Sequence, residues 1–162
     1  MATVDNSFFI LKLFAILGCG LMAGVFFAFS TFVMNALARL QPTQGIVAMQ
    51  SINITVINPL FMTAFLGTGV ACMILLISLL LNRHQPSAVY LLAGSLLYLF
   101  GTFGVTIIFN VPLNKALAIA NPDSTDGVKL WTSYLTNWTF WNHIRTAAAL
   151  AASALLTIAL RY

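Results

Sequence analysis

Four long apolar runs constrain this chain more than any other feature of its sequence. They extend over about residues 8–37, 60–81, 88–109 and 141–160, and each is long enough to cross the roughly 30 Å hydrocarbon core of a bilayer as a helix. Only 10 of the 162 residues are Lys, Arg, Asp or Glu, whereas about a quarter of a soluble domain is charged. The sequence therefore predicts an all-α fold, a four-transmembrane-helix bundle that forms one integral membrane domain over residues 1–162.

Two longer connections, residues 39–57 and 110–140, separate these runs. Residues 45–56 place apolar side chains at helical spacing among polar ones, which is typical of a helix at a membrane interface. Asn121–Ser124 is predicted to be a turn, and Asp126 is a candidate cap for a helix that continues into the fourth run. In a chain with four spans both connections fall on the same side, so we expect two interfacial helical connections on one membrane face.

Helix boundaries are marked by prolines and asparagines. The second span is expected to begin after Asn58 and Pro59, because Asn caps helices and Pro is tolerated at the first helical position. The third is expected to end near Pro112, because a proline inside a helix removes a hydrogen bond. A polar turn at residues 82–87 joins these two spans.

Polar residues gather at the span ends on the side of the two connections. The i, i+4 spacing of Asn35 and Arg39, and of Asn110 and Asn114, puts each pair on one side of its helix. Asn53 precedes the second span. Polar groups at membrane depth are costly unless they are paired or line a cavity, so we expect a shared pocket that opens to this face. Mutual hydrogen bonding between helices is the alternative.

The fourth span carries an aromatic stripe. At 100° per residue, one sector of about 100° contains an aromatic series that ends in an amide and a cation, namely Trp131, Tyr134, Trp138, Trp141, Asn142 and Arg145. Trp138 and Trp141 suit either a pocket wall or an interfacial aromatic belt. His143 points about 150° away from the middle of this stripe.

Several of these side chains have chemistry suited to a reaction site. His143 has an unperturbed pKa near neutrality and is the candidate general base, unless it only bonds a neighbouring carbonyl or threonine. Arg39 and Arg145 are candidates to stabilise an oxyanion or superoxide, although Arg39 also suits a helix-end anchor. Asn35, Asn110 and Asn142 are candidate donors to a carbonyl or phenolate oxygen.

A metal or cofactor site is not expected within one chain. A single histidine on this side cannot form a bis-histidine haem site, and no span contains an acidic residue for a di-iron carboxylate site. Cys19 and Cys72 lie inside apolar runs without the paired spacing of a metal site, and we interpret them as small hydrophobic residues. A cofactor-free or quinone-like site fits better. The few basic residues are scattered, so no nucleic-acid partner is expected.

Five segments, in order along nearly the whole chain, resemble the anthrone oxygenase-like family of small four-helix membrane proteins. They are Phe29–Leu37, Ala48–Asn53, Asn58–Met62, Phe109–Asn114 and Trp141–Thr146. Fungal members of that family oxidise anthrones to anthraquinones with dioxygen and no added cofactor, and most members are bacterial. The resemblance implies a multi-pass protein of the cell membrane, specifically the bacterial inner membrane. It also implies a site that includes Asn110, Asn114, Trp138, Trp141, Asn142, His143 and Arg145.

Two functions follow as hypotheses. The first is an oxygenase that acts on a hydrophobic aromatic small molecule: His143 removes a proton, Asn142, Arg145 and the other amides stabilise the negative charge, and Asn35, Arg39, Asn53, Asn110, Asn114, Trp138 and Trp141 bind the substrate. The second is a non-catalytic module or complex subunit that holds a membrane lipid, a quinone or a partner helix. Gly20 and Gly24 would allow close helix packing, including in a homo-oligomer.

Overall fold

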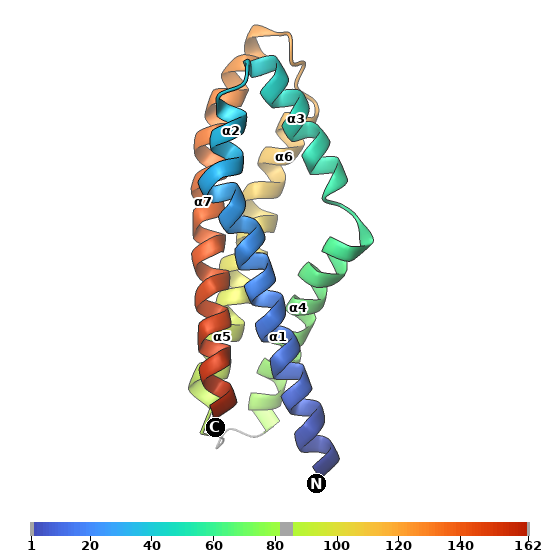
Figure 1. Ribbon diagram of the computed structural model, residues 1–162, viewed down its shortest axis with the longest axis vertical. Helices are drawn as coiled ribbons and strands as arrows, with labels where there is room; N and C mark the ends of the chain where they lie inside the picture. The colour runs from blue at the N-terminus through green and yellow to red at the C-terminus, as the bar shows by residue number, and fades with distance from the viewer. Residues whose placement is uncertain (1, 82–85, 162) are drawn as a thin grey trace.

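The computed structural model describes residues 2–81 and 86–161, and these residues are mostly helical (Figure 1). Within the described residues, four helical stretches are long and apolar enough to cross a membrane: Asn6–Ala38, Pro59–Leu79, Ala88–Ala118 and Thr125–Arg161. The predicted all-α fold with four membrane-spanning stretches is confirmed. Of the polar turn predicted at 82–87, residues 82–85 lie outside the described residues.

The first two spans are joined by a helix that folds back along the bundle. The first span consists of α1 (Ala2–Ala28), the π-helical turn η1 (Phe29–Val33) and α2 (Met34–Ala38). The connecting helix α3 (Pro42–Thr55) then leads to α4 (Pro59–Leu81) through a turn that projects outwards (Figure 1). Asn58 caps α4 as predicted, because its Oδ1 accepts a hydrogen bond from the N–H of Phe61 at 3.0 Å.

The third span continues past the proline that was expected to end it. It runs through α5 (Ala88–Leu96), the π-helical segments η2 (Leu97–Gly104) and η3 (Thr106–Asn110), and α6 (Val111–Ala118). Pro112 lies in the first turn of α6, directly after η3. The wider π-helical turn changes the hydrogen-bond register there, so the missing proline N–H does not end the helix.

The helix that leads into the fourth span begins directly after the predicted turn Asn121–Ser124, as expected. Helix α7 (Thr125–Ile158) is continuous and ends in a 3-10 turn, η4 (Ala159–Arg161). Its cap is Ser124, whose Oγ accepts from the N–H of Gly127 at 3.0 Å, and not Asp126. The second connection therefore consists of α6, a short turn and the first turns of α7. Helix α6 continues the third span after residue 109, and α7 begins before residue 141.

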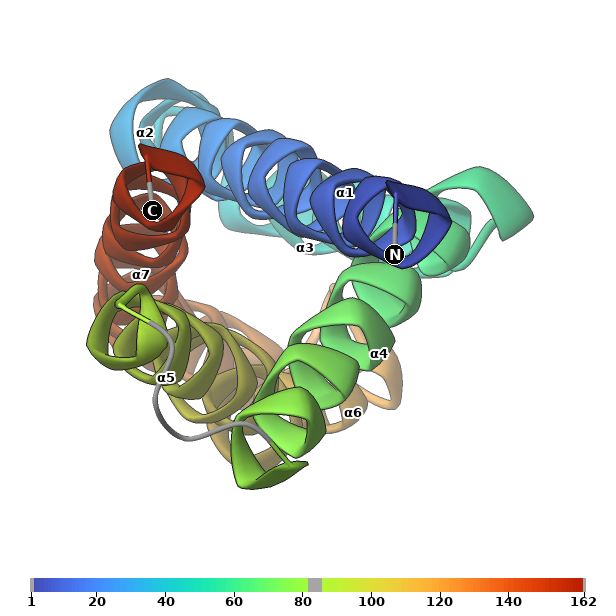
Figure 2. The same ribbon diagram turned by 90° about the horizontal axis from the view of Figure 1, so that it is seen from below.

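The four spans are arranged in a ring, with α7 beside both α1 and the third span (Figure 2). A Cβ placed on Gly101 would lie 2.6 Å from the Cβ of Ala148, so η2 and α7 approach closely because one side has no side chain. Glycine allows the same approach between α3 and α7, where a Cβ on Gly45 would lie 2.8 Å from the Trp131 ring.

Two hydrophobic clusters divide the interior along its length. The first fills the end near the N-terminus, where α1, α4, α5 and α7 meet, and includes Cys19, Cys72, Phe65 and Tyr98. The second fills the opposite end, where α3 and α6 cover α2 and α7. We call the second one the cap cluster. It consists of Met34, Leu37, Ile46, Met49, Leu117, Trp131, Tyr134 and Trp138.

Candidate functional site

A cavity of about 320 Å³ lies between the two clusters. All four spans and α3 contribute to its wall, which is mostly apolar and rich in phenylalanine. Four of its lining residues carry polar or charged side chains: Asn53, Thr106, Asn114 and Arg145. An apolar hollow of this size with a few convergent polar groups is typical of a small-molecule site.

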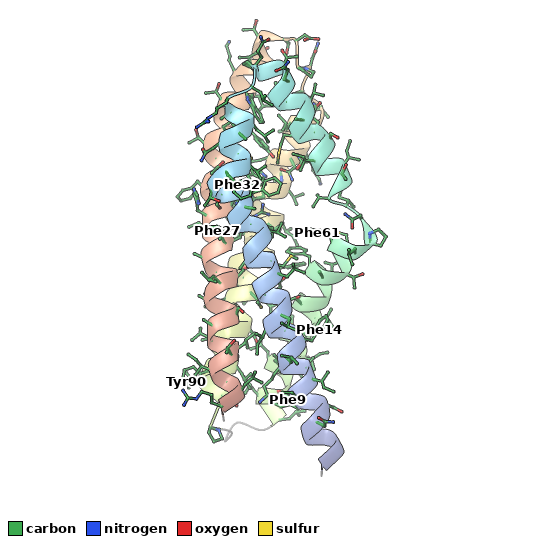
Figure 3. All side chains as sticks on the ribbon, in the orientation of Figure 1. Phe9, Phe14, Phe27, Phe32, Phe61 and Tyr90 are labelled. Atoms are coloured by element: carbon green, nitrogen blue, oxygen red, sulfur yellow. The ribbon has the colours of Figure 1, made fainter. Side chains whose placement is uncertain are left out.

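Aromatic rings form one side of the cavity. Phe65 stacks on Phe61 with ring centroids 6.0 Å apart and on Phe103 with centroids 5.3 Å apart. Phe61 points from α4 into the space that faces α1 (Figure 3). These flat surfaces suit a planar aromatic body, because offset and edge-on ring contacts stabilise such pairs.

Arg145 is the charged group of the cavity. Only 6% of the residue is exposed, yet it lines the hollow. Its guanidinium carbon lies 4.0 Å from the centroid of the Phe26 ring and 4.8 Å from that of Trp138, so two aromatic faces contact the cation. Its NH1 donates to Oγ1 of Thr106 at 3.3 Å. These neighbours hold the charge without neutralising it.

Asn142 positions this arginine. The Oδ1 of Asn142 accepts from Nε of Arg145 at 2.8 Å, while its Nδ2 donates to the carbonyl of Phe26 at 2.7 Å and to Oγ of Ser30 at 2.6 Å. The amide is fully buried and is not among the residues that line the cavity. It therefore links α7 to the first span and fixes the direction of the guanidinium.

Asn114 joins the cavity to the cap cluster. Its Oδ1 accepts two hydrogen bonds, from the phenol of Tyr134 and from the indole N–H of Trp138, each at 2.8 Å. Both donors are buried aromatic residues that need a polar partner. Asn114 is also one of the polar residues that line the cavity.

Asn53 and Asn110 each have an unsatisfied polar atom. These atoms are Nδ2 of Asn53 and Oδ1 of Asn110, and both are buried without a hydrogen-bond partner. Of the two residues, Asn53 lines the cavity. Nδ2 of Asn110 donates to the carbonyl of Trp138 at 3.1 Å, so Asn110 mainly ties the third span to α7. A buried donor without a partner is costly, and in Asn53 this donor belongs to a residue of the cavity wall.

His143, Asn35 and Arg39 lie outside this constellation, contrary to the expectation of a shared pocket. All three side chains are exposed and none lines the cavity. His143 is one residue from Asn142, and at 100° per residue this turns it away from the buried side of α7. Nδ2 of Asn35 donates to the carbonyl of Thr31 in its own helix at 2.7 Å.

Trp141 also stays outside the cavity wall. It stacks on Phe109 with ring centroids 3.6 Å apart and an angle of 8° between the rings, and it meets Phe140 edge-on. Trp138, by contrast, is buried and lines the cavity. The two tryptophans of the predicted stripe therefore have different surroundings.

Ser30 and the phenylalanines are parts of the site that the sequence did not predict. Ser30 bonds both Asn142 and the hydroxyl of Thr146, at 3.2 Å for the latter. The signal was present, because Ser30 follows Met22 and Phe26 at i, i+4 spacing on the buried stripe of the first span. The predicted pair on this span, Asn35 and Arg39, lies on the exposed side.

The described residues contain no cluster of three or more His, Cys, Asp or Glu side chains with metal-binding geometry. The chain has three acidic residues, Asp5, Asp123 and Asp126. Asp126 precedes Arg145 by 19 positions on α7, which is about 28 Å of helix, and it lies 3.7 Å from Lys129. Asp5 belongs to the first turns of α1, about 31 Å of helix from Phe26. Among the side chains that the structure describes, no carboxylate therefore pairs with Arg145.

Comparison with known proteins gives one family. The model of the anthrone oxygenase family matches residues 61–155, which is more than half of the chain and includes Asn110, Asn114, Trp138, Asn142 and Arg145. No curated protein and no solved structure gives a significant match. The chain belongs to the anthrone oxygenase family.

Proposed function

We propose that this protein is an oxygenase of the cell membrane that oxidises a phenolic or polycyclic aromatic substrate with dioxygen, without an added cofactor, in the cavity beside Arg145. The observation that carries the proposal is the buried guanidinium, which lines an aromatic-walled hollow and has no carboxylate partner among the described side chains. A site of this kind favours the anionic form of an aromatic substrate, because a fixed positive charge in apolar surroundings acts strongly on a nearby negative one.

The reaction is that of an acidic methylene group that is conjugated with a ketone through the aromatic rings between them. Loss of one proton gives a carbanion whose charge is shared with the ketone oxygen, and that oxygen accepts hydrogen bonds from Arg145. The carbanion adds dioxygen to form a carbon–oxygen bond, and the peroxide takes up a proton. Loss of the second methylene proton and cleavage of the O–O bond then give a new ketone and one water molecule.

In this proposal Arg145 supplies most of the driving force for the deprotonation. His143 faces away from the cavity, and the described lining residues include no histidine or carboxylate. The first proton therefore passes to water or hydroxide, and the guanidinium lowers the cost of the anion that remains. Asn53 and Asn114 offer amide donors to a second substrate oxygen.

A second candidate function is a non-catalytic binding module that holds a quinone or a lipid in the same cavity. It is favoured by the mostly apolar wall, because apolar side chains are sufficient to bind a lipid or a quinone without catalysing a reaction. The two functions differ in their response to dioxygen, because a binding module takes up ligand without consuming oxygen.

Oxygen uptake by the purified protein with an anthrone separates the two candidates. Because anthrones oxidise slowly in air, the protein-dependent rate is measured above a protein-free control. We expect uptake by the wild type, unchanged uptake by Arg161→Gln and a large fall in Arg145→Gln. Arg161 is a matched control, since it is an exposed arginine at the end of the last helix. Equal rates with and without wild-type protein, over several phenolic substrates, would refute the oxygenase.

A further inference from the structure

The route into the cavity follows from which of its walls are closed. At one end the cap cluster seals it: Met49 and Trp138 belong both to that cluster and to the cavity wall. Nε2 of Gln50 donates to the carbonyls of Leu117 and Ala120, at 2.9 and 3.1 Å, and so pins α3 over the end of α6. At the other end the buried rings of Phe26 and Phe65 form the floor.

One flank of the cavity is open. Three of its lining residues have strongly exposed side chains: Ile57 at 71%, Leu66 at 43% and Ile107 at 49%. They belong to the α3–α4 turn, to α4 and to η3, and the turn is the outermost point on its side of the bundle (Figure 1). Leu66 and Ile107 both lie within candidate membrane spans.

The chemistry of this opening is that of a lipid-facing surface. Its three exposed residues are branched aliphatic side chains, whereas an entrance from water would expose polar groups at its rim. The polar groups of the cavity, Asn53, Asn114 and Arg145, lie among the buried or half-buried residues of its wall. A ligand that enters here meets apolar surface first and the guanidinium afterwards.

We propose that the cavity binds a membrane-dissolved amphiphile with an apolar aromatic body and one anionic oxygen, which enters sideways between α4 and η3 so that the anionic oxygen meets Arg145. The phenylalanine-lined wall holds the body, and the anion supplies the charge that the chain itself does not place beside Arg145. Nδ2 of Asn53 gives the same oxygen or a second one a hydrogen bond. The inference rests on the proposed function for the choice of this cavity as the substrate site.

Binding is tested with a pair of non-reacting probes, anthracene-2-carboxylate and anthracene-2-carboxamide, in lipid nanodiscs at pH 8. Energy transfer from tryptophan to anthracene reports occupancy, and protein-free nanodiscs correct for partition into lipid. We expect the carboxylate to bind the wild type about tenfold more tightly than the amide, because a charge-assisted hydrogen bond is roughly twice as strong as a neutral one. Arg145→Gln should abolish this preference, and Arg161→Gln should keep it.

Two further variants keep this test decisive if Arg145→Gln does not fold. Arg145→Lys retains a cation and should retain a preference for the carboxylate. Thr106→Asp places a carboxylate at the position that NH1 of Arg145 contacts, and so should remove the preference while the amide still binds. An equal affinity of the wild type for both probes, or a preference that survives in Arg145→Gln or Thr106→Asp, would overturn the anion site.

The entrance is tested by the rate at which the carboxylate reaches the site from labelled vesicles. Ile107→Trp should slow this transfer several-fold, because the larger side chain fills the opening. Ile108→Trp is the matched control: Ile108 is its neighbour and 64% exposed, but it does not line the cavity. Equal rates in the two variants would refute the lateral route. Because neither probe reacts, these binding results stand whether or not the protein consumes oxygen, so the two proposals fail separately.

Discussion

Nε of Arg145 donates to Oδ1 of Asn142 across 2.8 Å, one turn apart on α7. The same amide is anchored to the first span through Phe26 and Ser30. One buried side chain thus connects the packing of two helices with the direction of the only charge in the described cavity wall. In the proposed reaction, Asn142 acts through Arg145 and is a positioning residue.

This relationship predicts non-additive variants. Asn142→Leu should weaken both the anthrone reaction and the carboxylate preference of the binding probes, because the guanidinium loses the acceptor that orients it. In an Arg145→Gln background the same change should have little further effect on the preference. Double-mutant analysis with the probe pair measures this coupling. Fully additive effects would show that Asn142 does not act through Arg145.

The two bonds accepted by Asn114 predict a specific loss of stability. Asn114→Leu leaves the phenol of Tyr134 and the indole of Trp138 without an acceptor, at a cost of about 2–4 kcal/mol in the free energy of unfolding. Asn35→Leu is the control, since Asn35 is exposed and bonds only its own helix among the described contacts. Unfolding in detergent, followed by tryptophan fluorescence, should separate the two variants. Equal stability would contradict the role of Asn114.

Two glycines give opposite predictions for the same substitution. Gly45→Ala forces a Cβ against the rigid Trp131 ring and should destabilise the contact of α3 with α7 by about 1–3 kcal/mol. Gly24→Ala meets no atom within 4 Å and should be neutral or slightly stabilising, since alanine favours helix. Thermal unfolding of both variants in one detergent checks this. A Gly45→Ala protein as stable as Gly24→Ala would show that α3 packs differently.

His143 provides a direct contrast between the sequence hypothesis and the geometry. As the general base, its loss in His143→Ala would abolish oxygen uptake. From its place on the exposed side of α7 we expect His143→Ala to retain the wild-type rate and the carboxylate preference. Initial rates over a range of pH decide the matter. A rate that collapses in His143→Ala and recovers with added imidazole would contradict the present account.

Hydropathy was sufficient to predict the four membrane-spanning helices, because a run of about twenty apolar residues is typical of a transmembrane helix. Helical periodicity was sufficient for the buried side of α7, where Trp131, Tyr134, Trp138, Asn142 and Arg145 are all buried. The same periodicity placed His143 far from that stripe. His143 was nevertheless predicted to face the pocket, whereas in the structure it lies on the exposed side of α7.

What could not be predicted depends on how helices cross. Asn53 was among the predicted binding residues and it lines the cavity, but the return of α3 along the bundle, which brings it there, has no local signal in the sequence. The continuation of the third span past Pro112 depends on π-helical turns, which also have no periodic signal because tertiary packing decides them. Ser30 was within reach, since it continues the apolar stripe of the first span on the side that faces α7.

The most direct test of the central claim measures transfer of oxygen from ¹⁸O₂ to the product of an anthrone, by mass spectrometry under initial-rate conditions. We expect that wild-type protein accelerates formation of a ketone that carries one ¹⁸O atom above the protein-free rate, and that Arg145→Gln returns this rate to the protein-free level while Arg161→Gln does not. If Arg145→Gln forms the labelled product as fast as the wild type, the buried guanidinium is not the centre of the reaction.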